Sequence, residues 1–160
     1  MKVWNIEKWR LAFVLFALSL AGLIVHGEPQ QSALTFQPGI VTTIAGSGVT
    51  GSSGDGGVAT SAKVSAGMKG VAVDASGDVF FIDNVNFTVR VVYGGGSVAA
   101  QLITAENPTV TTPVIGNIYV IAGVEGSSGT PANGKLASGQ KLSTSNGGAL
   151  CLDAAGDIYY

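Results

Sequence analysis

One nine-residue pattern occurs twice in this chain and constrains its fold more than any other feature: residues 73–81 read VDASGDVFF, and residues 152–160 read LDAAGDIYY. The copies of this and of two other stretches lie 75 to 79 residues apart and keep the same order. The other stretches are TTIAGSG at 42–48, which returns as YVIAGVEG at 119–126, and GSSG at 51–54, which returns at 126–129. A fixed order of apolar runs and glycine turns predicts a repeat architecture, in which similar units pack side by side.

The composition favours short strands joined by tight turns. Glycine accounts for 24 of the 160 residues, and charged residues make up only 11%. The apolar runs are rich in Val, Ile and Thr, as is usual for strands. The ASG at 75–77 separates two of these runs and predicts a hairpin, because glycine takes positive φ in such connections. We expect an all-β fold with strands at 40–46, 70–74, 78–83, 88–93, 117–123, 148–153 and 157–160.

The first 27 residues have the pattern of a secretory signal peptide. A basic head is followed by the uncharged run LAFVLFALSLAGLIV and by Gly27 before a cleavage point. This run is shorter than the ~20 residues that a stable membrane span needs. We therefore expect a signal-peptide helix at 1–27, a polar linker at 28–39, and export to the periplasm, cell envelope or medium. The alternative is an uncleaved signal that anchors the chain in a membrane by its N-terminus.

The remaining residues, 28–160, exclude several classes of function. They carry five basic and nine acidic side chains, so they lack the basic surface that binds nucleic acid or an anionic membrane. The single histidine, His26, lies in the signal peptide, which excludes Ser-His-Asp and Cys-His catalysis and histidine-ligated zinc from the exported part. Cys151 is the only cysteine, so no intramolecular disulfide can form.

Residues 41–92 resemble the NHL-repeat family. The stretch VTTIAGSGVTGSSGDGGVATSAKV, with GVAVDASGDVFFIDNVNFTVRVV after it, is similar to the family's ITTIAGTG, GYSGDGGPATSAQL and GVAVDSAGNVYIADTGNNRIRKV. The aspartate of the family's IAD falls on Asp83, its following asparagine on Asn86 and its second arginine on Arg90. The family's TGNNR corner is NVNFT here, and this departure makes Phe87 a candidate partner contact.

The resemblance implies a β-propeller built from four-stranded antiparallel blades. Strands 70–74, 79–83, 88–93 and 117–122 would form one complete blade, with an insertion at 94–116. Strand 41–45 would end a preceding blade, and residues 148–160 would begin a further one. We therefore expect 40–160 to be a fragment of a propeller, with one complete blade and two partial ones. Remaining blades or self-association would be needed to close the ring.

Asp55 in the stretch SGDGG is the one candidate metal ligand. Calcium takes 6–8 oxygen ligands, and this stretch offers a single acid. The repeat at 126–136 reads GSSGTPANGKL and lacks that aspartate. A turn former, whose carboxylate bonds a nearby backbone N–H, is therefore the favoured interpretation. The stretch 46–54 also lacks the Lys-Ser/Thr of a phosphate-binding loop. Five other aspartates recur at strand ends, where we expect caps: Asp74, Asp78, Asp83, Asp153 and Asp157.

These observations favour an exported, non-enzymatic interaction or scaffold module that binds a protein, peptide or glycan. No catalytic residue and no cofactor are predicted. The alternative is a lactonase-like or lyase-type propeller enzyme that uses a central calcium ion. Such an enzyme needs several acidic or amide side chains that converge on the axis, and none of the three glutamates after residue 27 lies in an expected strand. They are Glu28, Glu106 and Glu125.

Overall fold

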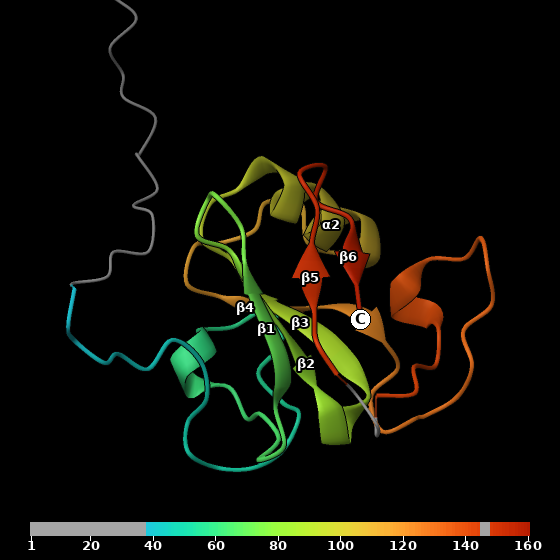
Figure 1. The fold of residues 1–160 in the computed structure, drawn as a ribbon, viewed down its shortest axis with the longest axis horizontal. Coiled ribbons are helices and arrows are strands. Elements are labelled where there is room, and N and C mark those ends of the chain that lie inside the picture. Colours follow the sequence, from blue (N-terminus) through green and yellow to red (C-terminus); the bar gives the residue numbers. More distant parts are fainter. Residues whose placement is uncertain (1–37, 145–147) are drawn as a thin grey trace, which may run out of the picture. The chain divides into compact units, whose positions relative to one another are not determined.

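The computed structural model describes residues 38–144 and 148–160 (Figure 1). The expected signal peptide and nearly all of the linker at 28–39 lie outside the described residues. Within the described part of the chain, no helix has the length and apolarity needed to span a bilayer.

The structure is mostly β (Figure 1). An antiparallel sheet takes its four strands in chain order, β1-β2-β3-β4, and a separate antiparallel hairpin, β5-β6, follows. The strands are β1 (Lys69–Val73), β2 (Val79–Asp83), β3 (Thr88–Val92), β4 (Ile118–Gly123), β5 (Cys151–Leu152) and β6 (Ile158–Tyr159). The predictions of strands in these regions, and of one antiparallel sheet formed by the first four, are confirmed.

The prediction of a strand at 40–46 is wrong. These residues are irregular, and the side chains of Ile40 and Val41 are 62% and 100% exposed. β-Branched residues form a strand only beside a partner edge, and among the described residues no strand precedes β1 to pair with 40–46. The backbone here is held instead by the Gly46 N–H, which donates to the Ala59 carbonyl at 2.9 Å.

The insertion at 94–116 contains a helix that the sequence analysis did not anticipate. Helix α2 runs over Ser97–Glu106. Ala99 and Ile103, four residues apart and therefore on one side of the helix, are both fully buried against the sheet. The expected all-β class is therefore too narrow, because a mostly β structure carries one α-helix among the described residues.

Both faces of the sheet are buried at its inner strands, β2 and β3. Alternate residues of β2 point to opposite sides, so Phe80 packs in one cluster with α2, while Phe81 packs in a second with Ala59 and Ala62. All five residues of β2 and of β3 are buried as a result. The sheet is thus a central layer between the 44–64 segment and the layer formed by α2 and the second hairpin.

The two copies of the nine-residue pattern form the same hairpin turn. The Asp74 carboxylate accepts hydrogen bonds from the backbone N–H groups two and four residues later, both at 2.9 Å. The Asp153 carboxylate does the same at 2.9 Å in the second copy. Gly77 and Gly156 follow with φ values of 86° and 88°, a region that glycine adopts without strain. The predicted hairpins, and the capping role of these two aspartates, are confirmed.

Candidate functional site

The structure corrects the alignment of the two repeats around the candidate metal ligand. The Gly51 N–H donates to the Val64 carbonyl at 3.4 Å, and the Gly129 N–H donates to the Leu142 carbonyl at the same distance. Short 3-10 turns follow the same spacing, at Ala59–Ser61 and Ala137–Gly139. The structural equivalent of the GSSG at 51–54 is therefore 129–132, and its match to 126–129 in the sequence alignment is wrong.

In the corrected register Asn133 stands where the first copy has Asp55. The next residues, Gly56 and Gly134, agree in backbone conformation, with φ values of 76° and 72°. The second copy has therefore exchanged a carboxylate for an amide of nearly the same shape, and has not lost the side chain. The matching Lys63-Val64 and Lys141-Leu142 pairs are the sequence signal that could have revealed this.

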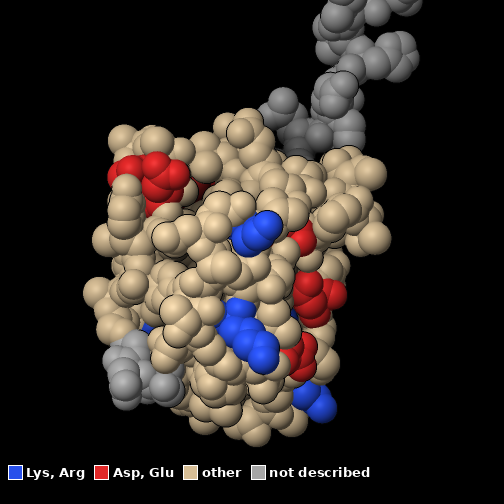
Figure 2. Space-filling model, turned by 90° about the vertical axis from the view of Figure 1, so that its right-hand side faces the viewer, with Lys and Arg blue, Asp and Glu red and all other residues tan. Residues whose placement is uncertain are grey.

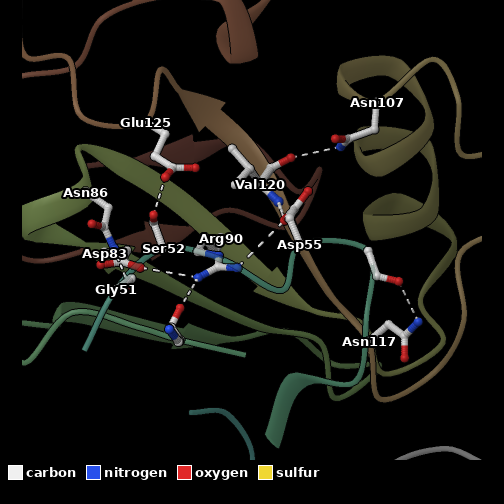
Figure 3. A network of polar contacts seen from close by, with 12 residues as sticks. Gly51, Ser52, Asp55, Asp83, Asn86, Arg90, Asn107, Asn117, Val120 and Glu125 are labelled. Carbon is white, nitrogen blue, oxygen red and sulfur yellow. Dashed lines mark hydrogen bonds and ion pairs between the residues drawn. The ribbon is translucent and has the colours of Figure 1, made fainter. Parts of the chain in front are cut away.

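Residues 54–59 lie along the outer edge of β4, and we call them the first edge loop (Figure 3). The Gly56 N–H donates to the Ile118 carbonyl at 2.7 Å, and the Ile118 N–H donates to the Gly57 carbonyl at 2.9 Å. The Asn117 side chain adds a bond to the Gly56 carbonyl at 2.9 Å. These bonds pair the loop with β4 as an extra strand would, which protects the edge from other chains.

Asp55 completes this edge. Its Oδ1 accepts the N–H of Val120, while the Asn107 side chain donates to the Val120 carbonyl at 2.8 Å. The expectation that Asp55 bonds a nearby backbone N–H within its own turn is wrong, since its partner lies 65 residues further on.

Burial raises the pKa of Asp55, although the Val120 hydrogen bond and the Arg90 charge each lower it. Within the described residues, no three His, Cys, Asp or Glu side chains gather where they could hold a metal ion.

Behind Asp55 lies the buried guanidinium of Arg90 in β3 (Figure 3). Its Nη1 lies 3.4 Å from Oδ2 of Asp83, which is fully buried, and donates to the Lys63 carbonyl at 2.9 Å. Its Nη2 lies 3.9 Å from the partly exposed Asp55. Asp83 also accepts the Ser65 N–H at 3.2 Å. This network joins β2, β3 and the 51–64 segment. Both of its aspartates, Asp55 and Asp83, are bonded to groups of the protein itself.

Asp78 holds the start of α2. Its buried carboxylate accepts the N–H groups of three consecutive residues, 94–96, immediately before the helix. Burial raises the pKa of Asp78, and the neighbouring Asp74 raises it further, whereas the hydrogen bond from Gly94 lowers it. A carboxylate near a helix N-terminus also compensates the positive end of the helix dipole. Asp78 therefore has a structural role, but it orders the turn that leads into α2 and is not the strand-end cap that was expected.

Phe87, the candidate partner contact, lies at the β2-β3 corner in a half-buried position. Its φ is 58°, a left-handed conformation that non-glycine residues adopt rarely. Val85 is the exposed apolar side chain of this corner, with 59% of its surface accessible. The corner therefore presents Val85 to solvent more than Phe87.

A cavity of about 190 Å³ lies between β4, α2 and β6. Its walls are mostly apolar, and its acidic groups are Glu106 and Asp157. The Glu106 carboxylate already accepts the N–H groups of Ala137 and Ser138. On the face shown in Figure 2, uncharged residues cover most of the surface, and basic and acidic side chains lie next to one another towards its lower right.

Comparisons of the chain with models of known families, with curated proteins and with solved structures find no match.

Proposed function

We propose that the chain is an exported, non-enzymatic interaction module of the NHL type, which binds a protein, peptide or glycan partner. The proposal rests on one observation: the aspartates that suggested chemistry accept hydrogen bonds from the protein's own backbone. Asp74, Asp78, Asp83 and Asp153 accept backbone N–H groups, and Asp55 bonds the β4 edge. The residues that suggested chemistry therefore serve folding, and binding is left to the exposed surface.

That surface includes apolar side chains on strands. Val71 and Val73 of β1 are 61% and 59% exposed, and Tyr159 of β6 is 55% exposed. Exposed apolar groups on regular elements fit a polypeptide partner better than a small charged substrate. An NHL-type propeller blade is part of the proposal, and it is supported by the chain-order sheet, the repeated hairpin and the loop on the outer strand.

The decisive experiment measures calcium binding and hydrolysis together. The full chain is titrated with calcium and followed by thermal melting, and a panel of lactones is tested in parallel. We expect no rise in melting temperature over a magnesium control and no lactone turnover. A calcium-specific rise accompanied by turnover would overturn the proposal in favour of a lactonase-like enzyme. Mass spectrometry of the exported protein tests the other half, with a mature N-terminus expected near Glu28.

A further inference from the structure

The loop between α2 and β4 presents three threonine side chains to solvent. Thr109, Thr111 and Thr112 are all exposed, and they stand between two prolines in the sequence NPTVTTPV at 107–114. Among the described residues, none of the three hydroxyls has a hydrogen-bond partner. The described part of the chain therefore makes no structural use of these hydroxyls.

The two ends of this loop are fixed to the sheet and the helix. At the first end, the Asn107 side chain donates to the Ile103 carbonyl at 3.1 Å and to the Val120 carbonyl at 2.8 Å. At the second end, the Val114 N–H donates to the Tyr119 hydroxyl at 2.9 Å. The threonines are therefore held in an ordered loop.

The side chains between these ends separate by type. Val110 packs against the core and Pro113 is buried, whereas the three threonines are exposed. The backbone of 107–114 belongs to no helix or strand, so an enzyme can bind it without breaking a regular element. Threonines grouped with prolines are the composition of O-glycosylated segments of exported proteins.

The sequence also contains an Asn-x-Thr site for an N-linked sugar, and the structure places it differently. This site is Asn86-Phe87-Thr88. The Asn86 side-chain nitrogen donates to the Gly51 carbonyl at 2.7 Å, and Thr88 is only 2% exposed. The folded chain thus uses the nitrogen to which an N-linked sugar would be attached, whereas the hydroxyls of the loop are free for an O-linked one.

We propose that Thr109, Thr111 and Thr112 are acceptors of O-linked sugars. In this transfer the threonine Oγ1 bonds to the anomeric carbon of a sugar carried on a phosphate ester. The sugar–phosphate bond breaks, the phosphate leaves with the bonding electron pair, and the hydroxyl proton passes to a base of the transferase. The attached sugars are bulky and polar, and they make this face of the protein more soluble. This inference rests on the export that is part of the proposed function.

The test uses the full chain recovered from the cells that make it and from their medium. Trypsin releases the loop in one peptide, residues 91–135, because no Lys or Arg lies between Arg90 and Lys135. We expect this peptide to exceed the mass of its sequence by whole sugar residues, and mass-spectrometric fragmentation to place the sugars on the three threonines. The peptide 70–90, which contains Asn86, should have its unmodified mass.

Variants of the loop test the assignment of the acceptors. The triple variant Thr109→Val, Thr111→Val and Thr112→Val should lose the added mass completely, because valine keeps the β-branched shape and lacks the hydroxyl. Thr60→Val, at an exposed threonine without flanking prolines, is the matched control and should keep all of the added mass. Since the three hydroxyls have no protein partner, the triple variant should unfold at the same urea concentration as the parent.

The outcomes separate this inference from the proposed function. An exported chain with its mature N-terminus near Glu28, whose peptide 91–135 has its unmodified mass, would overturn the inference and leave the proposed function standing. Sugar that persists in the triple variant would also overturn it, because the acceptor would then be another residue of the peptide. An unmodified chain that stays inside the cell with its N-terminal segment uncleaved would overturn both.

Discussion

Removal of the Arg90 guanidinium tests how the buried network stabilises the sheet. Arg90 is 1% exposed and Asp83 is fully buried, with 3.4 Å between their charged atoms. At an effective dielectric constant of about 20, this pair attracts by about 5 kcal/mol. Both charges lost their hydration on folding, so the net contribution is smaller. Arg90→Met leaves the Asp83 charge buried without a counter-ion, and we expect it to lower the free energy of unfolding by about 3–5 kcal/mol.

The double-mutant cycle with Asp83→Asn separates the pair from the packing. The amide can still accept the Ser65 N–H and carries no charge, so Arg90→Met in this background leaves no buried anion beside it. We expect the double variant to be more stable than the sum of the single changes by about 2–3 kcal/mol. Arg90→Lys, which keeps the charge without the planar fork, provides a milder variant in case Arg90→Met does not fold.

The assay is equilibrium urea unfolding of the full chain at pH 7, followed by circular dichroism. Additivity of the two changes within about 0.5 kcal/mol would refute the ion-pair argument. A cost of Arg90→Met below about 1 kcal/mol would refute the claim that the network holds β2, β3 and the 51–64 segment together, because that is the magnitude of a surface pair.

Three further predictions use the same unfolding measurement. Because burial raises the pKa of Asp55, the folded state keeps this proton to a higher pH than the unfolded state does, and stability falls as the pH rises from 3.8 through the raised pKa. Asp55→Asn should make this fall smaller and leave the part that the raised pKa of Asp78 contributes, whereas a profile that matches the parent's would contradict the prediction. Gly123→Ala should lower the free energy of unfolding by at least about 2 kcal/mol more than Gly126→Ala does. Both glycines have positive φ, but only at Gly123 would an added Cβ press against the Phe87 carbonyl, so equal losses would argue against that contact. Asp78→Ala should lower the free energy of unfolding by about 3 kcal/mol and reduce the helical signal, because three N–H groups lose their acceptor. Asp157→Ala, at the exposed equivalent position, should change it by less than about 0.5 kcal/mol. Similar losses for the two variants would mean that Asp78 does not order α2.

The sequence predicted those parts of the fold that depend on neighbouring residues. The apolar runs at 79–83 and 88–92 and the Asp-x-x-Gly-Asp turns form their strands and hairpins through local backbone preferences and short-range bonds. The strand expected at 40–46 shows the limit of such reasoning. Its β propensity is as high as that of the true strands, but no strand precedes β1 among the described residues to give it a partner edge.

The sequence could not give the partner of Asp55, since the choice between its own turn and a strand 65 residues away depends on which segments meet. Nor could it give the correct register of the repeats. The letters GSSG match at 126–129, whereas the backbone bonds match at 129–132.

What the sequence determined by itself was the repeated strand-turn-strand unit, because that unit is stabilised by side chains within a few residues of one another. The tertiary structure alone decided that SGDGG binds the edge of β4, that Asp83 and Asp55 flank a buried arginine, and that Asn133 lies exposed in the equivalent loop. Each of these depends on long-range pairing, in which a backbone N–H or a buried charge takes whichever partner the packed sheet places within reach.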